Sequence, residues 1–214
     1  MAPQIALNEV EARVLGVLVE KAMTTPDQYP LSLHAATAGC NQKNNRLPLV
    51  EWTEAKVHVG LQGLAMKHLA GRSFQAGGRV EKFRHNGGET LGVDDAHLAV
   101  LAELLMRGPQ QPGELRSRVE RMTPTPTLEA LQARLAHLIE KGYVQRIDPG
   151  AGSRAERYVQ LLAAGLHPLD APAADAAPAR AASPSGLEAR VSTLEGQVGE
   201  LRAKIEGLLS QLGA

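Results

Sequence analysis

Cysteine and aromatic residues are scarce in this chain of 214 residues, which has one cysteine and only 3% aromatic residues. The single cysteine, Cys40, excludes a disulfide within the chain and is typical of a reducing compartment. No apolar run reaches the roughly 18 residues that a membrane span needs. No basic segment followed by an apolar block marks a signal peptide. We therefore expect a cytoplasmic protein with mainly aliphatic cores and no membrane partner.

The charge balance gives no bulk attraction to an acidic partner. The chain has 23 Lys and Arg residues and 23 Asp and Glu residues, so its formal net charge is zero. Residues 1–92 hold ten basic and eight acidic residues, a small positive excess. Because a neutral protein lacks the strong positive field of many nucleic-acid-binding proteins, any contact with DNA must come from locally placed basic side chains.

Residues that often carry catalysis or bind metals show no recognisable spacing. The seven histidines have no paired ligand pattern such as His-x₃-His, and Cys-x₂-Cys is absent. Gly77-Gly78 and Gly87-Gly88 lack the Lys-Ser/Thr of a phosphate-binding loop, so we predict turns there. Cys40 and His34 do not make a convincing nucleophile–base pair, because a free cysteine is more often buried. We expect no enzyme, no catalytic residue, no metal and no cofactor.

One stretch of the chain, Thr53–Phe83, occurs twice, and the second copy follows about 74 residues later. Thr53, Val57, Leu61, Leu64 and Lys67 are matched by Thr127, Leu131, Leu135, Leu138 and Lys141. The pattern predicts a helix over Thr53–Leu69, a strand at Arg72–Phe74 and a return strand at Arg79–Phe83. A helix that leads into a basic hairpin is typical of the second half of a winged helix-turn-helix, and the duplication makes chance periodicity a poor explanation.

The helices that precede this stretch are also repeated. Val14, Leu15, Leu18 and Val19 are matched by Val100, Leu101, Leu104 and Leu105, 86 residues later. We expect Asn8 to cap the first helix and Ser32 to cap a second one over Leu33–Cys40. The first copy therefore carries twelve extra residues, which lie in Thr24–Pro30 and Asn41–Trp52. We predict that Thr24–Pro30 is extended because of its prolines.

We predict a mainly α fold with small β-hairpins, of the α+β class. It has two tandem winged helix-turn-helix domains followed by a C-terminal coiled-coil helix. The domain boundaries are 1–92 for the first winged helix, 93–162 for the second, 163–186 for a flexible Ala/Pro-rich linker and 187–214 for the coiled coil. In the connector of the first domain, Leu49, Val50 and Trp52 are expected to pack onto the domain.

The C-terminal segment has an unbroken heptad seam. Its members are Leu187, Val191, Leu194, Val198, Leu201, Ile205, Leu208 and Leu212. Branched residues alternate with leucine, which favours a parallel two-stranded coiled coil. We therefore predict a homodimer, although the seam could instead dock onto the protein's own domains.

Basic and amide side chains near the first repeat are the candidate nucleic-acid-binding residues. They are Lys43, Asn45, Arg46, Lys56, Arg72, Arg79, Lys82 and Arg84. Basic residues of a hairpin can reach phosphates, but alternating charges also suit a solvated ribbon. The polar loop Cys40–Arg46 suits phosphate contacts, turn formation and helix capping. The third helix is a poor base reader, since it is expected to expose Glu54, Lys56, His58 and Gln62.

Several long motifs resemble the YceH family of uncharacterised bacterial proteins. They are Glu11–Lys21, Thr24–Leu33, Cys40–Arg46, Leu104–Gln110 and Gly113–Arg116, and the resemblance covers residues 5–162. It implies tandem winged-helix domains in a bacterial cytoplasmic protein, and it implies no particular activity. Leu47-Pro48-Leu49 departs from the acidic residue and Pro-Val expected in that family, which would alter the surface of the loop.

These observations lead to two functional hypotheses. The first is a non-enzymatic, DNA-associated or transcription-regulatory dimer, in which the first winged helix contacts duplex DNA. The alternative is an interaction scaffold in which the winged helices bind a protein partner without DNA. The neutral net charge and the acidic residues early in both third helices favour the alternative, whereas the basic hairpin favours DNA.

Overall fold

The computed structural model describes residues 5–73, 80–149 and 156–167. The chain divides into two compact units, Met1–Ala171 and Pro172–Ala214. All described residues belong to the first unit. The predicted heptad seam, most of the predicted linker, Arg79 and the turn at Gly77-Gly78 lie outside the described residues.

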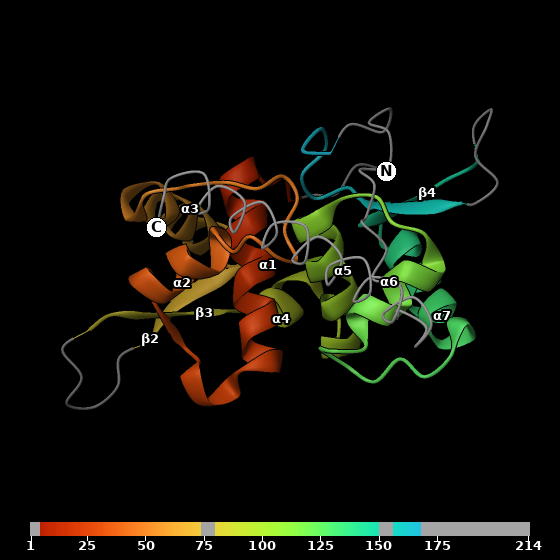
Figure 1. Cartoon of the computed structure of the whole chain (residues 1–214), viewed down its shortest axis with the longest axis horizontal. Coiled ribbons are helices and arrows are strands. Elements are labelled where there is room, and N and C mark those ends of the chain that lie inside the picture. Colours follow the sequence, from red (N-terminus) through yellow and green to blue (C-terminus); the bar gives the residue numbers. More distant parts are fainter. Residues whose placement is uncertain (1–4, 74–79, 150–155, 168–214) are drawn as a thin grey trace, which may run out of the picture. The chain divides into compact units, whose positions relative to one another are not determined.

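The first half of the described chain contains three α-helices and a small sheet (Figure 1). Its elements are α1 (Glu9–Thr24), the 3₁₀ turn η1 (Pro26–Gln28), β1 (Leu31–Ser32), α2 (Leu33–Cys40), α3 (Glu54–Met66), β2 (Ala70–Ser73) and β3 (Lys82–His85). The sheet is antiparallel, in the order β1-β3-β2.

The second half repeats this order of three helices and a hairpin. A short helix, α4 (Gly87–Leu91), joins the halves, and α5 (Asp95–Arg107), α6 (Pro112–Val119), α7 (Leu128–Glu140), β4 (Val144–Ile147) and β5 (Arg157–Gln160) follow. Strands β4 and β5 pair antiparallel. The predicted α+β class, mainly helical with small antiparallel sheets, is therefore confirmed for the described residues.

Helix starts agree closely with the capping residues predicted from the sequence. The side chain of Asn8 accepts from the backbone N–H of Glu11 at 3.0 Å, while the carboxylate of Glu11 accepts from the backbone N–H of Asn8 at 2.8 Å. This reciprocal capping box satisfies two donors at the start of α1. Ser32 caps α2 as predicted, and the matched residues Thr53 and Thr127 cap α3 and α7, in each case through the hydroxyl group.

Three local predictions were wrong. Pro26–Gln28 forms a 3₁₀ turn and is not extended, because proline suits the first position of a helical turn as well as extended chain. Gly87-Gly88 begins α4 and is not a simple turn. At Gly87 an added Cβ would lie 3.1 Å from Leu98 Cδ1, so this glycine allows α4 to approach α5 closely. Leu49 is 60% exposed, whereas Trp52 is buried as expected.

Strand β1 was not predicted from the sequence. It has two residues, and its pairing places Leu31 opposite Phe83, which are both buried. Residues directly opposite each other in an antiparallel pair lie on the same face, so this face of the sheet packs toward the core. Two residues are too few to show the alternation that marks a strand in a sequence.

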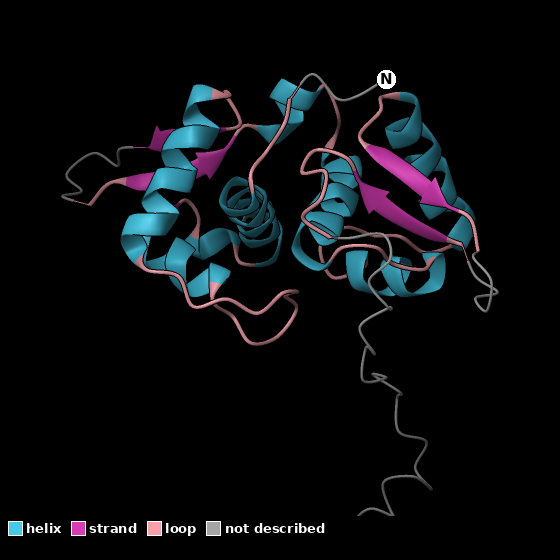
Figure 2. Ribbon diagram, turned by 90° about the horizontal axis from the view of Figure 1, so that it is seen from above, coloured by secondary structure: helices cyan, strands magenta, loops and turns pink. Residues whose placement is uncertain are grey.

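The two halves meet along α1 and α5, which lie side by side between the hairpins (Figures 1 and 2). A Cβ added at Gly16 would lie 2.7 Å from Met106 Cγ and 3.3 Å from the carbonyl oxygen of Ala102. Ala102 follows Gly16 by 86 residues, the offset that relates the two first helices. Equivalent positions of the two copies therefore meet, and glycine at one of them allows the close approach.

The described chain returns to this junction after β5. The backbone N–H of Leu7 donates to the carbonyl of Leu162 at 2.6 Å. His167 is buried, and its Nε2 lies 3.1 Å from the carbonyl oxygen of Leu47. Burial lowers the pKa of His167, so the neutral ring donates this hydrogen bond. Residues 163–167, the start of the predicted linker, are thus part of the folded first unit.

No helix among the described residues is long and apolar enough to cross a bilayer.

Candidate interaction surface and charged junction

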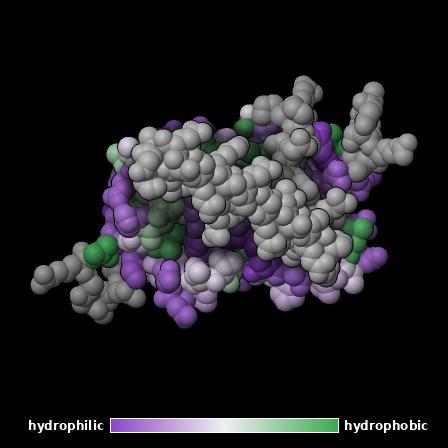
Figure 3. Space-filling model, in the orientation of Figure 1, coloured by the Kyte–Doolittle hydropathy of each residue, from purple (hydrophilic) through white to green (hydrophobic). Residues whose placement is uncertain are grey.

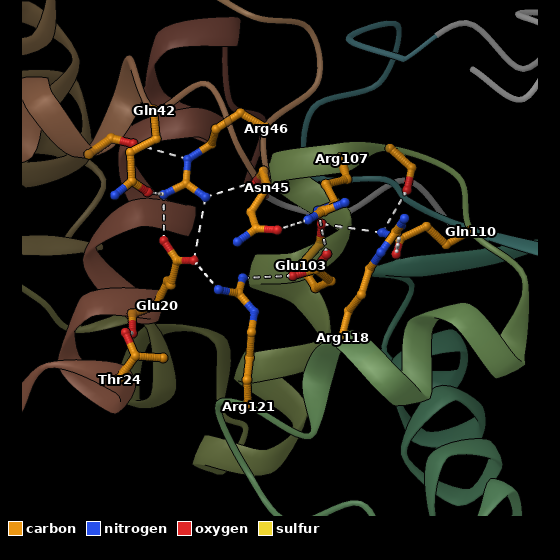
Figure 4. Close-up of polar contacts among 12 residues, drawn as sticks. Glu20, Thr24, Gln42, Asn45, Arg46, Glu103, Arg107, Gln110, Arg118 and Arg121 are labelled. Atoms are coloured by element: carbon orange, nitrogen blue, oxygen red, sulfur yellow. Dashed lines mark hydrogen bonds and ion pairs between the residues drawn. The ribbon is translucent and has the colours of Figure 1, made fainter. Parts of the chain in front are cut away.

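The structure divides the predicted nucleic-acid-binding residues between the interior and several surfaces. Arg46 is buried, and its guanidinium points toward the carboxylate of Glu20, with which it forms an ion pair (Figure 4). Arg46 Nε also donates to the carbonyl of Gly39 at 3.0 Å, and Nη2 donates to Gln42 Oε1 at 2.9 Å. Because every side of the group is occupied by protein, Arg46 is not available to a phosphate in this conformation.

Arg46 belongs to a group of charges that we call the junction cluster. Its members are Glu20, Arg46, Glu103, Arg107 and Arg121. Arg121 bridges the two halves, since its Nη1 lies 2.5 Å from Glu20 Oε1 on α1 and its Nη2 lies 3.1 Å from Glu103 Oε2 on α5. The side chains of Glu20 and Glu103 are 2% and 0% exposed. Buried carboxylates of this kind require cationic partners to remain charged.

The pKa values around the junction follow from this competition between burial and pairing. Burial alone would raise the pKa of Glu20, but hydrogen bonds and charges from Arg46 and Arg121 outweigh it and lower the pKa. Burial alone would lower the pKa of Arg121, but Glu20 and Glu103 outweigh it and raise the pKa. Both partners therefore stay ionised around neutral pH.

The polar loop of the first copy reaches the second copy at this point. Asn45 has a φ of 61°, a left-handed conformation that asparagine tolerates better than most residues. Its Oδ1 accepts a hydrogen bond from Arg107, whose Nε forms an ion pair with Glu103 at 2.9 Å (Figure 4). The backbone N–H of Leu47 donates to the carbonyl of Met106 at 2.8 Å. Part of the insertion found in the sequence thus joins the two copies.

The basic residues of the first hairpin are divided between its two faces. The register pairs Arg72 with Phe83, Ser73 with Lys82 and Gly71 with Arg84. Arg72 therefore shares the face of the buried Phe83, and it forms an ion pair with Glu81 at 3.0 Å. Lys82 and Arg84 lie on the opposite face, and Arg84 is exposed. Among the described residues of the hairpin, this face of β3 offers two cations to a phosphate.

Lys43 and Lys56 are exposed on other elements. Lys43 lies in the loop after α2, and Lys56 lies in the first turn of α3. The Lys56 ammonium lies 4.6 Å from the centroid of the Trp52 ring, which is a cation–π contact. His58, expected to be exposed, is half-buried, with its ring edge-on to Phe83 at a centroid distance of 6.3 Å.

The side of α3 that points away from the core is mainly apolar. Its exposed residues Ala55, Val59, Gln62 and Met66 follow one another at helical spacing, and we call them the outward stripe. Val59 is 64% exposed and Met66 is 83% exposed. On the face seen in Figure 3, hydrophilic residues predominate and hydrophobic ones form small separate patches. Leu128 and Ile139 on α7 are also exposed, at 38% and 40%, so Val59 and Met66 are the most exposed of the large apolar side chains on the described helices.

The equivalent face of α7 is different. With the offset of 74 residues, the four positions of the outward stripe correspond to Glu129, Ala133, Ala136 and Glu140, which are all exposed. The buried positions of the two helices are aliphatic in both copies. The fold therefore needs the buried residues twice, but it does not need Val59 or Met66.

An open groove of about 400 Å³ runs between α3 and the start of α1. It is lined by Asn8, Glu9, Val10, Lys56, Val59 and Gly60. A Cβ added at Gly60 would lie 2.6 Å from Val10 Cγ1, so this glycine allows the two helices to touch at the floor of the groove. The groove adjoins the outward stripe through Val59.

The residues weighed for catalysis are not placed for it. Cys40 is buried, and burial raises the pKa of its thiol to about 12, so the nucleophilic thiolate is disfavoured. His34 is exposed and its Nδ1 lies 2.9 Å from Glu54 Oε1. Within the described ranges, no group of three or more His, Cys, Asp or Glu side chains is arranged to hold a metal ion.

Sequence reasoning missed the other members of the junction cluster. Glu103 lies within the apolar segment Leu98–Met106, where an acidic residue interrupts a run of buried positions. Glu20 lies next to Val17, Leu18 and Val19, which are also buried. A carboxylate at the edge of an apolar helical face was the available signal, because buried carboxylates need partners.

Together these features define a class of protein: an α+β protein built from a duplicated unit of three helices and a hairpin, joined by buried ion pairs. The model of the family described as "Protein of unknown function, DUF480" matches residues 7–153, so the chain belongs to this family. The match is consistent with the resemblance to the YceH family.

Relatives from several bacteria cover nearly the whole chain. The chain is 46% identical over 200 residues to a UPF0502 protein of Geotalea uraniireducens, and the aligned region covers 92% of this chain and 90% of the relative. It is 43% identical over 204 residues to a UPF0502 protein of Pelobacter propionicus, covering 94% and 93%. It is 40% identical over 215 residues to a UPF0502 protein of Shewanella oneidensis, covering 94% and 97%.

Proposed function

We propose that this protein is a tandem winged-helix adaptor whose first copy binds a protein partner through the outward stripe of α3. Two observations support the winged-helix assignment: each copy has three helices followed by an antiparallel hairpin, and the third helix of each copy leads directly into its hairpin. The adaptor is non-enzymatic and acts in the cytoplasm.

The contrast between α3 and α7 carries the proposal. A helix that reads bases presents mainly Arg, Lys, Asn or Gln to the groove, whereas the outward stripe presents Val59 and Met66 around a single amide, Gln62. Exposed apolar side chains on one face mark interaction sites when the fold does not require them. The second copy shows that the fold does not require them here.

Val59→Glu is expected to abolish association with the partner, because a charge would be buried in an apolar contact. The measurement is affinity purification of the tagged full chain after cross-linking in its native host, with quantification of the co-purified proteins. Ala133→Glu, the equivalent change on α7, is the matched control and should leave the yield of the partner unchanged. Equal recovery with Val59→Glu and the unaltered protein would count against the proposal.

DNA contact through the first hairpin is the second candidate, supported by Lys82 and Arg84 on the outer face of β3. The double variant Lys82→Glu/Arg84→Glu is expected to weaken binding to duplex DNA and to reduce its salt dependence, because each phosphate contact contributes to the salt slope. Fluorescence anisotropy at about 50 mM salt, where phosphate contacts are strong, measures both. An unaltered protein that does not bind DNA under these conditions excludes this candidate.

A homodimer formed through the heptad seam, Leu187–Leu212, is part of the adaptor proposal, since two partner sites per assembly would raise the avidity. The supporting observation is the sequence pattern. Sedimentation should give a dimer for the full chain and a monomer for Leu194→Asp/Leu201→Asp, in which two charges interrupt the seam. A monomer in both cases refutes the dimer.

A further inference from the structure

We infer that the groove between α1 and α3 takes an amphipathic helix of the partner, with a large apolar anchor beside Val59 and opposite charges on its two flanks. This inference rests on the proposed function and specifies the chemistry of the partner. The occupant follows from the shape of the groove, the spacing of the outward stripe and the charges at the rim.

The groove is lined mainly by the faces of two helices, whose interior backbone groups are paired within each helix. The start of α1 is closed by the capping box between Asn8 and Glu11, which satisfies two of the amide donors there. An extended peptide that binds by strand addition needs unpaired backbone donors and acceptors, which a helix face lacks. A partner segment that satisfies its own backbone, as a helix does, meets this surface without leaving buried polar groups unpaired.

The outward stripe matches the repeat of an amphipathic helix. Val59 and Met66 are seven residues apart, which corresponds to about two turns and roughly 10.5 Å along α3. Helices that bind in grooves present apolar anchors at i, i+3 or i+4, and i+7. One such anchor can enter the groove at Val10, Val59 and Gly60, and a second one can cover Met66.

The rim of the groove carries one charge of each sign. Glu9 and Lys56 both line it and are both exposed. The cation–π contact with Trp52 favours a position of the Lys56 ammonium beside the groove. A partner helix complements the rim when an acidic residue near its anchor faces Lys56 and a basic residue faces Glu9.

The test is selection of a displayed library of amphipathic 20-residue helical peptides against the immobilised full chain. We expect enriched peptides with apolar anchors at helical spacing and an acidic residue at a fixed offset from the anchor. Selection against Lys56→Glu should replace that acid by a base. Peptides from the first selection should bind Val59→Glu roughly 30-fold more weakly, the effect of losing one hot-spot residue, and should bind Ala133→Glu unchanged.

Several results would overturn the inference. Enriched peptides without apolar anchors at helical spacing would do so. So would peptides selected against Lys56→Glu that carry the same flanking charge as peptides selected against the unaltered protein. A smaller sedimentation coefficient for Val59→Glu alone would assign the stripe to a second copy of this chain. Circular dichroism of each variant verifies folding, and Met66→Glu replaces Val59→Glu if that variant is unfolded.

The two levels of the proposal fail separately. If Val59→Glu abolishes recovery of the partner protein but the selected peptides show no helical pattern, the adaptor function stands and the helical partner is refuted. Recovery of the partner that is independent of Val59 would refute the adaptor function at this surface, whatever the peptides show.

Discussion

Replacing Glu20 with alanine is expected to lower the free energy of unfolding by about 3–5 kcal/mol, the typical cost of removing one partner of a buried ion pair. The Glu20 carboxylate is 2% exposed and is shared by Arg46 and Arg121. Its removal leaves the buried Arg46 guanidinium without its only carboxylate partner among the described contacts. Urea denaturation followed by the fluorescence of Trp52, the only tryptophan, measures the change.

Glu114→Ala is the matched control for this prediction. Glu114 also pairs with an arginine, Arg118, but its side chain is 35% exposed and the two residues are four apart on α6. Exposed pairs contribute about 0–1 kcal/mol, so this variant should unfold close to the unaltered protein. A loss for Glu20→Ala no larger than that for Glu114→Ala would show that the junction cluster does not stabilise the fold.

The buried Glu20 carboxylate also determines how the stability of the fold changes with pH. The pKa of Glu20 is lowered in the folded protein, so the folded state binds this proton less readily than the unfolded chain does. The contribution of Glu20 to stability is therefore complete above the unfolded pKa of 4.5 and is lost as the pH falls through the folded value. Glu20→Ala should remove this part of the acid sensitivity along with the stability.

Features set by neighbouring residues were predictable from the sequence. The helices follow from apolar residues at helical spacing and from capping residues such as Asn8 and Ser32, whose effects are local. The duplication strengthened these predictions, since an error in one copy would have conflicted with the other. The hairpins were placed within two or three residues of β2 and β3, where the repeat of Arg and Lys made the exact register ambiguous.

Features set by distant partners were not predictable. The direction of Arg46 depends on Glu20, which precedes it by 26 residues and lies on another element. In the sequence, an arginine in a polar loop suits a phosphate and a buried carboxylate equally well. Strand β1 likewise depends on Phe83, which is far along the chain.

The candidate site was missed for a different reason. Val59 and Met66 belong to the generally apolar sequence of α3, and their neighbours Val57, Leu61 and Leu64 are buried. Only the orientation of the helix on α1 shows which apolar residues face solvent. Aligning α3 with α7 position by position would have indicated them earlier, because the repeat acts as an internal control for what the fold requires.

Gly16→Leu is the second large effect that we expect, with a loss of about 3 kcal/mol, at the upper end of the cost of overpacking a well-packed core. The new side chain would begin 2.7 Å from Met106 Cγ and 3.3 Å from the carbonyl oxygen of Ala102, so α1 and α5 would have to separate. Part of the cost is offset, because replacing glycine inside a helix contributes about 1 kcal/mol.

Gly113→Leu separates the clash from this gain in helix propensity. Gly113 lies in α6, and nothing lies within 4 Å of a Cβ added there. Gly113→Leu should be neutral or slightly stabilising, while Gly16→Leu should be strongly destabilising.

Thermal unfolding of both variants also tests how the copies depend on each other. Because α1 supplies core residues to its own copy and Glu20 to the junction cluster, displacement of α1 from α5 should weaken both halves. A single transition at lower temperature is therefore expected; a second half that melts unchanged in Gly16→Leu would show that the copies are stable independently of their junction.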